Sequence, residues 1–431
     1  MTSPDPRIAP RHWGLLSFLT LLNVMNFVDR QLLASFANFI VPDLGLTNAQ
    51  YGLLTGLAFL FFYSIMGLFM GALADLVHRP RLIAVGLLLW SALTAASGAA
   101  RGFVSLLIPR MLVGVGESSL TPTSLSLLTD RFPAQRLGLA VGIYYLGVPV
   151  GVGASLLVAG YLGPAIGWRN CFYLLGGIGI LLAFGMLFVK ETRPTGRQAA
   201  VERPRISEIF SSSFAALRRS PALSATIAGG VVWHFVLGAA AFDQLWYVQE
   251  LGFDRARILQ LTGWIGMCGG IVGNLVGGWG GDWWQRTRTT GRTMFLVWLG
   301  VILAPLSVAY RLADGPTVWF WVGVFLGFFQ LGTFYGPTFA TVQELAPTQS
   351  RGTVAAFYIL MLNLAGVGIG TTAGGFVIDA LAERGHATPY GTTLLAFTII
   401  SMFAVPLFWY AGIRFRKDRD AIAAAGAQAN R

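Results

Sequence analysis

The chain has 431 residues, of which 55% are hydrophobic and only 11% charged, with a mean hydropathy of +0.64 and a formal net charge of +11. A soluble fold needs roughly a quarter charged residues to cover its surface, so this composition excludes a soluble globular protein and indicates one embedded in lipid. The basic residues are spread between apolar runs and form no patch, which argues against a nucleic-acid-binding protein.

Twelve apolar runs, each long enough to cross a membrane, follow one another along the chain. A spanning helix needs roughly 20 mostly apolar residues. Runs of this kind begin near Trp13, Tyr51, Leu82, Val104, Leu137, Cys171, Leu223, Leu259, Met294, Val318, Val354 and Thr393. The first run is too long for the core of a signal peptide, so we expect it to remain as the first helix. The sequence therefore predicts an all-α membrane protein with twelve transmembrane helices.

A polar break from Lys190 to Ser220, rich in Arg, Pro and Ser, lies near the middle of the chain. It predicts a cytoplasmic linker over residues 191–220. The linker would join an N-terminal six-helix half, residues 1–190, to a C-terminal six-helix half, residues 221–431. Within the linker, the stretch Ile206–Leu217 is expected to form a short surface helix.

The distribution of basic residues predicts the orientation in the membrane. Most arginines fall in the tails, the linker and the turns on one face. The opposite face receives only Arg101, Arg169, Arg255, Arg257, Arg311 and Arg384. Because loops rich in Lys and Arg stay in the cytoplasm, we expect both termini to be cytoplasmic. The predicted location is the cell membrane, which is the inner membrane in a Gram-negative cell.

The two halves share an ordered series of short motifs, separated by about half the chain. The matched pairs are Gly71–Asp75 with Gly278–Asp282, Pro122 with Pro337, Pro133–Gly138 with Pro347–Gly352, and Tyr144 with Tyr358. Each match is weak alone, but their common order favours an internal duplication. Two parallel six-helix repeats are the architecture of one class of transporter.

The turn after the second run carries a recognisable pattern. It reads Gly-Ala-Leu-Ala-Asp-Leu-Val-His-Arg-Pro-Arg over residues 71–81 and resembles the Gly-x-Leu-Ala-Asp-Arg-x-Gly-Arg-Arg signature of the major facilitator superfamily. Leu76 and His78 depart from that signature. The resemblance implies a twelve-helix fold and a cytoplasmic gate, whose candidate residues here are Asp75, Arg79, Arg81 and, in the second half, Asp282.

Two further motifs narrow the resemblance. Residues 110–117, Arg-Met-Leu-Val-Gly-Val-Gly-Glu, match the family's Arg-x-x-x-Gly-x-Gly element. The Asn26-Phe-Val-Asp29-Arg30 element together with Glu117 resembles the Spinster branch, which implies a proton-linked carrier of sphingoid or lysophospholipid-type substrates. The same Asn-x-x-Asp-Arg element also occurs in symporters of organic anions and sugar acids, so that alternative stays open.

Four ionisable residues lie inside predicted spanning helices, where a charge costs several kcal/mol unless it finds a partner or water. At about 1.5 Å per residue, Arg30 lies roughly 16 Å and Glu117 roughly 20 Å below the outer surface. We therefore expect these two to meet near the midplane, with Arg110 above them at roughly 9 Å. Asp29 points about 100° away from Arg30 and cannot share its partner.

We hypothesise that Glu117 and Asp29 bind the coupling protons. Arg30 and Arg110 would pair with these carboxylates or with an anionic substrate, because an arginine that gains an anion as a carboxylate is neutralised can couple the two events. The alternative is a static network that holds the first and fourth helices together.

The second half has no matching charged network at mid-depth in the sequence. Its polar and aromatic residues are candidates to line a cavity, together with one asparagine of the first half: Asn26, Gln330, Tyr335, Asn363 and His234. We find no phosphate-binding loop, no metal-ligand spacing and no nucleophile motif. We therefore expect no enzyme, no metal and no cofactor, with protons as the coupling ion.

These features together predict a proton-coupled secondary transporter that works by alternating access. The favoured substrate is an amphipathic lipid such as a lysolipid or a sphingoid phosphate, and the first alternative is a small organic anion or sugar acid. A non-transporting membrane receptor or scaffold is the alternative from another class. The expected partners are the substrate and membrane lipids, without nucleic acid, and the chain is expected to be a monomer.

Overall fold

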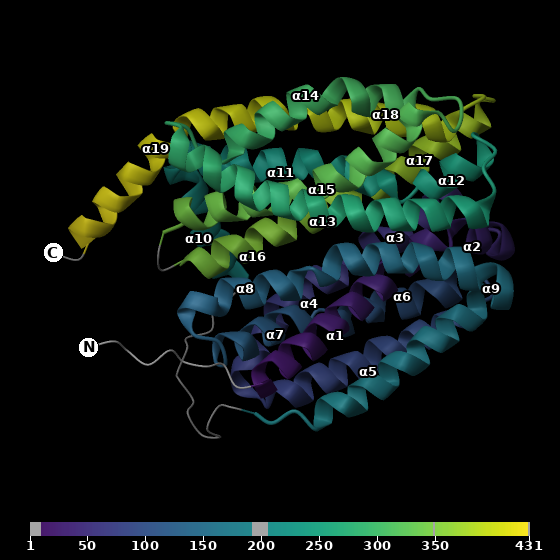
Figure 1. The fold of residues 1–431 in the computed structure, drawn as a ribbon, viewed down its shortest axis with the longest axis horizontal. Coiled ribbons are helices and arrows are strands. Elements are labelled where there is room, and N and C mark those ends of the chain that lie inside the picture. The colour runs from purple at the N-terminus through teal and green to yellow at the C-terminus, as the bar shows by residue number, and fades with distance from the viewer. Residues whose placement is uncertain (1–9, 192–205, 348–349, 430–431) are drawn as a thin grey trace. The chain divides into compact units, whose positions relative to one another are not determined.

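The structure is a computed structural model that describes residues 10–191, 206–347 and 350–429. Every regular element within these ranges is a helix, as Figure 1 shows. Ten helical stretches of the described chain are long and apolar enough to cross a membrane. The prediction of an all-α membrane protein is therefore confirmed.

The ten stretches are consistent with twelve crossings. The stretch 136–187 has 52 residues, about twice what one crossing requires, and its backbone breaks at Gly167, where φ is 79°. The first helix, Pro10–Ser35, has 26 residues but carries two asparagines and an Asp–Arg pair, and it is not among the ten. Counting 136–187 as two crossings and adding the first helix gives twelve.

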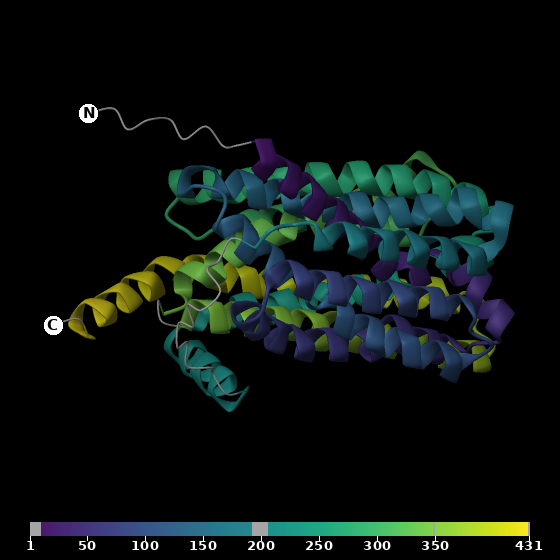
Figure 2. The same ribbon diagram turned by 90° about the horizontal axis from the view of Figure 1, so that it is seen from below.

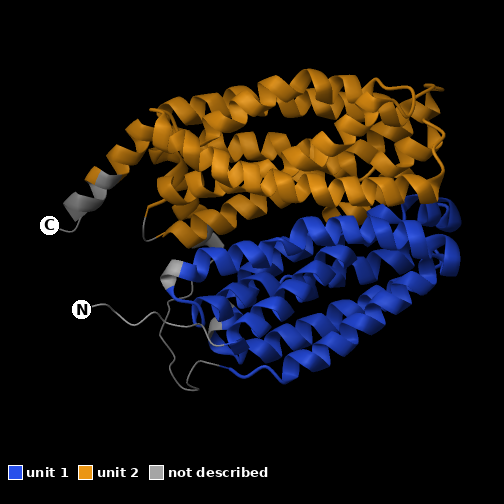
Figure 3. Ribbon diagram, viewed as in Figure 1, with its two compact units in different colours: residues 1–45, 58–202 blue, residues 46–57, 203–431 orange. Residues whose placement is uncertain are grey.

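The chain divides into two compact units, which Figure 3 colours separately. Unit 1 comprises residues 1–45 and 58–202. Its helices are α1 (Pro10–Ser35), α2 (Ala37–Leu44), α4 (Leu57–Leu76), α5 (Arg79–Gly98), α6 (Phe103–Glu117), α7 (Leu120–Thr129), α8 (Ala134–Tyr145) and α9 (Gly147–Leu187).

Unit 2 comprises residues 46–57 and 203–431, so a short segment between α2 and α4 groups with it. Its helices are α3 (Asn48–Thr55), α10 (Ile206–Arg219), α11 (Pro221–Ala240), α12 (Asp243–Gln249), α13 (Arg255–Thr287), α14 (Thr293–Arg311), α15 (Val318–Leu345), α16 (Arg351–Met361), the π-helical turn η2 (Leu362–Gly368), α17 (Ile369–Glu383), α18 (Pro389–Met402) and α19 (Ala404–Ala429). The predicted boundaries of the two halves, at residues 190 and 221, stay a prediction.

Breaks within the spans set the direction of key side chains. The fourth span consists of α6 and α7, and it breaks at Ser118 and Ser119, immediately after Glu117. The Ser118 hydroxyl donates to the carbonyl of Val115 at 2.7 Å, and the Ser119 hydroxyl donates to that of Gly116 at 2.8 Å. Serine hydroxyls that bond to the preceding turn bend helices, which accounts for the break at this point.

Close backbone contact joins α5 to α6 beside the same residues. A Cβ atom added to Gly116 would lie 2.9 Å from the Cβ of Trp90 and 2.9 Å from the carbonyl oxygen of Gly86. Only a glycine permits this approach, as is common where spanning helices pack tightly. The contact brings the Trp90 side chain of α5 next to the end of α6, where Glu117 lies.

The expected surface helix is present. It is α10, which begins at Ile206 as predicted and extends two residues beyond Leu217 to Arg219. In Figure 2 this teal helix lies at an angle to the long helices of unit 2 and does not run among them.

Candidate functional site

The structure brings Arg30 and Glu117 together in unit 1. The Arg30 Nε atom donates to Glu117 Oε2 at 3.1 Å, with 0% of the Glu117 side chain exposed and 19% of the Arg30 side chain. The Arg30 guanidinium also lies over the ring of Tyr63, 4.1 Å from its centroid, and over that of Phe27 at 4.8 Å. The ring of Phe59 lies 5.3 Å away as well, so the cation contacts one carboxylate and three aromatic rings.

Arg110 binds the main chain of the first helix. Its Nη2 atom donates to the carbonyl of Arg30 at 2.7 Å, and its Nη1 atom lies 3.5 Å from the carbonyl of Asp29. The guanidinium also lies 4.4 Å from the ring centroid of Phe59.

Asp29 has surroundings that differ from those of Glu117. Its side chain points to α5, where Trp90 Nε1 donates to Oδ2 at 3.2 Å. The residue is 2% exposed, and its Oδ1 atom has no hydrogen-bond partner among the described residues. The expected difference in direction between Asp29 and Arg30 is therefore present.

Two further buried polar atoms near the pair lack partners within the described part of the chain. They are Nδ2 of Asn26 and Oε1 of Glu117. Asn26 is 1% exposed, and its Oδ1 atom lies 3.5 Å from Nη2 of Arg30. Buried polar atoms in native proteins are usually satisfied, often by water.

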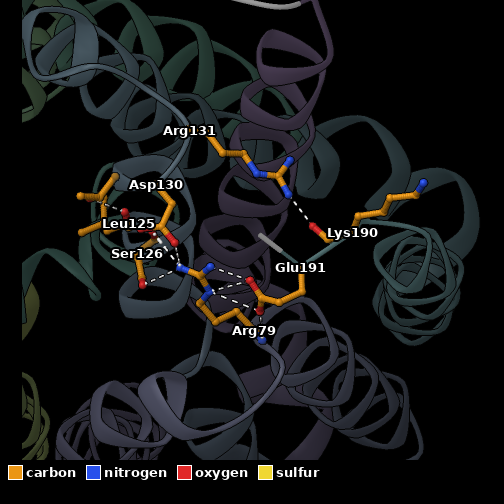
Figure 4. Close-up of polar contacts among 8 residues, drawn as sticks. Arg79, Leu125, Ser126, Asp130, Arg131, Lys190 and Glu191 are labelled. Atoms are coloured by element: carbon orange, nitrogen blue, oxygen red, sulfur yellow. Dashed lines mark hydrogen bonds and ion pairs between the residues drawn. The ribbon is translucent and has the colours of Figure 1, made fainter. Parts of the chain in front are cut away.

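The gate motif of unit 1 centres on Arg79, whose side chain is fully buried (Figure 4). Its Nη2 atom lies 2.5 Å from Glu191 Oε1, its Nη1 atom lies 2.6 Å from Asp130 Oδ2, and Nη1 also donates to the Ser126 hydroxyl at 3.1 Å. The loop after the second span is thereby bound to the ends of the fourth and sixth spans. Arg131 supports it by donating to the carbonyl of Lys190 at 2.5 Å.

The other residues of the unit 1 gate motif are placed less centrally. Arg81 is exposed, and its backbone N–H bonds to the Nδ1 atom of His78, the residue that caps α5. Asp75 lies in α4, and its side chain is outside the described part of the structure.

Unit 2 repeats the arginine–carboxylate arrangement. Arg292, at the start of α14, donates through Nε to Asp282 Oδ1 at 2.8 Å and through Nη1 to Glu344. Burial lowers the pKa of the Arg292 guanidinium, but its bonds to the two carboxylates raise it by more, so the net pKa is raised. In each unit an arginine at the start of the third span thus binds a carboxylate at the end of the fourth, Asp130 or Glu344.

This internal repeat agrees with a family-level match. The sequence model of the family described as Major Facilitator Superfamily matches residues 19–371 of the chain. The chain belongs to the major facilitator superfamily. It is accordingly a multi-pass membrane transporter and not an enzyme.

Three relatives within the superfamily match most of the chain at the same identity of 26%. An MFS-type efflux pump of Mycolicibacterium smegmatis is covered over 96% of its length and 97% of this chain. The hexuronate transporter of Bacillus subtilis is covered over 87% of its length and 85% of this chain. Protein spinster homolog 1 of Xenopus laevis is covered over 70% of its length and 82% of this chain.

A solved structure of a bacterial homolog to the human lysosomal transporter Spinster has the same fold. It was determined in an inward-facing, unoccupied conformation. The TM-score is 0.80, with 24% sequence identity, over 95% of this chain and 99% of that one. Together with the Xenopus relative, it agrees with the resemblance to the Spinster branch that the sequence indicates.

Four of the residues proposed to line a cavity lie in unit 2 of this superfamily member, and the fifth, Asn26, lies in unit 1. His234 is 2% exposed; its Nδ1 atom lies 2.8 Å from the Gly230 carbonyl and its Nε2 atom lies 3.4 Å from the Tyr335 hydroxyl. Gln330 donates to the Ser307 hydroxyl at 2.9 Å. Asn363 lies half-buried in the π-helical turn η2, a feature often found at functional positions.

One buried ion pair of unit 2 was not predicted from the sequence. Arg311 Nη1 lies 2.7 Å from Asp243 Oδ1, and the guanidinium also lies over the rings of Tyr310 and Trp246 at 4.7 and 5.2 Å. The sequence assigns Arg311 to the face opposite the cytoplasmic one and names no partner for it. In the structure it is the last residue of α14, with 6% of its side chain exposed. Asp243, a carboxylate in the seventh apolar run, was the available signal in the sequence, but it indicated no partner.

The sequence also missed Glu191 and Asp130, the partners of Arg79. Both lie at the ends of spans, next to polar turns. Asp130 is followed by the Pro133–Gly138 motif that recurs in unit 2, so the repeat could have identified it. Glu191 offered no such signal.

Proposed function

We propose that this transporter couples the movement of an anionic, amphipathic substrate to protons by alternating access. Lysolipids and sphingoid phosphates are the substrate class that we favour. The observation that carries the proposal is the arrangement in unit 1. Asp29 is a buried carboxyl group with Trp90 as its side-chain donor, next to a separate Arg30–Glu117 pair.

The proposed coupling rests on how Asp29 and Glu117 differ in their hydrogen-bond and ion-pair partners. A buried carboxylate with few donors is stabilised by taking up a proton, since burial disfavours the charge. Protonation of Glu117 would neutralise the partner of Arg30 and leave that guanidinium with unused donors. An anionic head group could then bind Arg30, and release of the anion would let Arg30 pair again with ionised Glu117 as the proton leaves.

The surroundings of Arg30 support an amphipathic substrate. A charged donor with 19% of its side chain exposed lies against the rings of Phe27 and Tyr63. A head group bound at Arg30 would therefore have aromatic surface beside it for the first part of an apolar chain. The similarity to a probable sphingolipid transporter of Arabidopsis thaliana, at 23% identity over 61% of this chain, supports the same class.

A small sugar acid is the second candidate substrate. The hexuronate transporter of Bacillus subtilis matches the chain over 85% of its length, which is the observation in its favour. A sugar acid would use the same arginine for its carboxylate. It would need hydroxyl-binding partners, for which Asn26, Gln330 and Asn363 are the candidates.

The test is substrate-driven proton movement into proteoliposomes, followed with an internal pH-sensitive dye. The panel contains a lysophospholipid, a sphingoid phosphate and a hexuronate. We expect the wild type to move protons with at least one of them and Glu117→Gln to lose that response. Glu383→Gln, which alters an exposed carboxylate at the end of α17, is the control and should retain it.

Two results would contradict the proposal. If Glu117→Gln retains the full proton response, the pair has only a structural role. If the wild type moves no protons with any member of the panel, proton coupling to these substrate classes is contradicted. The substrate class is assigned from the member of the panel that gives the faster proton movement.

A further inference from the structure

The helix α10 has a position that restricts what it can contact. Its last residue, Arg219, is separated from Pro221, the first residue of the spanning helix α11, by one residue. The C-terminal end of α10 is therefore at the level where α11 enters the membrane. With 14 residues it is about 21 Å long, too short to cross a bilayer, so it runs along the membrane surface or away from it.

Its contacts indicate that it runs along the surface. The rings of Phe210 and Phe214 pack on Phe357 of α16, with centroids 5.8 and 6.0 Å apart. Phe357 lies within the first two turns of a span that begins at Arg351, so it is near the same membrane surface as Pro221. The helix is thus held at both its middle and its end at one level of unit 2.

Unit 2 covers only part of the apolar face of α10. Ser213 and Ala216 are buried, at 0% and 3% exposure. Phe214 remains 54% exposed and Phe210 36% exposed, even though both touch Phe357. Two neighbouring aromatic side chains left this exposed form an apolar patch, and such patches mark sites of contact with protein or membrane. A second apolar surface is needed to cover them.

The order of side chains around the helix shows which surface this is. At about 100° per residue, Phe210 and Phe214 lie beside the buried Ser213, about 60–100° from it. Ser211 and Arg218 follow within about another 40–60°, and Arg219 lies on the far side. All three are exposed. A face buried against protein, then an aromatic face, then a basic face follow one another around the helix. This order is typical of a helix that lies in a membrane interface.

We propose that α10 lies in the plane of the bilayer surface. Phe210 and Phe214 enter the outermost acyl region, and Arg218 and Arg219 bind the phosphates of anionic lipid head groups. The occupant is a lipid bilayer because the spans of unit 2 already place one against this end of α10. The proposal does not depend on proton coupling or on the substrate.

The position of α10 is tested by lipid quenching of a fluorophore on the full chain in lipid nanodiscs. Bimane is attached at Phe214→Cys or, as the matched control one face away, at Ser211→Cys. Both carry Cys268→Ser, because Cys268 is exposed, whereas Cys171 is buried. With lipids brominated high in the acyl chain, we expect quenching at position 214 to exceed that at 211 about threefold. Aqueous iodide should give the reverse order.

Equal quenching of the two positions by brominated lipid, or stronger iodide quenching at 214, would overturn the membrane placement. Protection of 214 from both quenchers would also overturn it, since that result indicates a protein partner on this face.

The role of the arginines is tested with lipids of different charge. We expect lipid quenching at position 214 to rise about twofold when phosphatidylglycerol replaces part of a neutral lipid. The rise should disappear in Arg218→Gln/Arg219→Gln. It should persist in the control Arg257→Gln/Arg384→Gln, which changes exposed arginines of two other turns. A rise that persists in the first double variant would show that these two arginines do not bind the head groups.

Discussion

Asp29 of α1 and Glu117 of α6 are both buried, but different groups bind their carboxylates. Glu117 has a guanidinium on one oxygen at 3.1 Å, whereas the donor at Asp29 is the indole N–H of Trp90 at 3.2 Å. A neutral donor compensates a buried negative charge less well than a cation does. These contacts favour Glu117 as the ion-pair partner of Arg30 and Asp29 as a carboxyl group that can take up a proton.

This difference predicts the behaviour of Asp29→Asn. An amide has nearly the shape of a protonated carboxyl group and can still accept from Trp90. The free energy of unfolding of the variant should therefore lie within about 0.5 kcal/mol of the wild-type value. The variant cannot release a proton, so substrate-driven proton flux should fall by at least tenfold if Asp29 titrates. Thermal unfolding in detergent and proteoliposome flux measure the two effects. A stable variant with normal flux would remove Asp29 from the coupling mechanism.

At Arg79, the contribution of side-chain geometry to stability can be tested separately from that of its charge. Its guanidinium reaches Glu191, Asp130 and Ser126 together, which a lysine ammonium cannot do. Arg79→Lys keeps the charge but leaves buried acceptors unpaired, so we expect a loss of about 1–3 kcal/mol in the free energy of unfolding. Arg81→Lys, at an exposed position in the same motif, should stay within about 0.5 kcal/mol. Equal effects of the two changes on thermal unfolding would contradict this account.

At the scale of elements, α3 shows how a short helix is held in place by a distant one. The Asp379 carboxylate of α17 accepts from the backbone N–H and the side-chain amide of Asn48 at 3.1 and 2.8 Å, and from the backbone N–H of Ala49 at 2.7 Å. Tyr390 of α18 donates to the Asn48 side chain at 2.8 Å. Asp379 thus supplements the local cap from Thr47 at the N-terminus of α3.

Removing that carboxylate should loosen α3 more than the rest of unit 2. Loss of a helix cap costs about 0.5–2 kcal/mol, so Asp379→Ala should speed amide hydrogen exchange in residues 48–55 by about 2- to 30-fold. Mass spectrometry of deuterium uptake measures this by peptide. The control is Glu383→Ala, one turn further along α17 and exposed. Unchanged exchange in 48–55 would mean that Thr47 and close packing alone hold α3.

Sequence reasoning worked best for elements inside the spans. Arg30 and Glu117 could be predicted to meet because helix rise fixes depth along a span, and the structure pairs them. Glu191 and Asp130 lie where spans end, and periodicity does not determine the path of a turn. The Arg311–Asp243 pair was missed for a related reason, because an apolar run that stops at a charge looks the same whether the charge ends a helix or begins a loop. The breaks after Glu117 and before Asp243 left no periodic signal either.

At the scale of the whole molecule, the internal repeat is kept in the contact between its third and fourth spans but not in the buried charges that we propose for coupling. Arg79 with Asp130 and Arg292 with Glu344 are equivalent pairs. The Arg30–Glu117 pair joins the first and fourth spans of unit 1, whereas the Asp243–Arg311 pair joins the first and third spans of unit 2. If protons are coupled through unit 1, the two halves have kept a common frame and acquired different tasks.

This asymmetry predicts which ion pair the proton gradient acts on. In proteoliposomes with an imposed pH gradient, substrate accumulation by the wild type should collapse when a proton ionophore is added, because the gradient is the driving force. Glu117→Gln should exchange substrate without accumulating it and ignore the ionophore, since no proton accompanies the anion. Asp243→Asn breaks the ion pair of unit 2, so it should lower the unfolding temperature while the remaining folded protein keeps its response to the ionophore. Loss of that response in Asp243→Asn at full stability would show that unit 2 takes part in coupling, and the division of tasks between the halves would then be wrong.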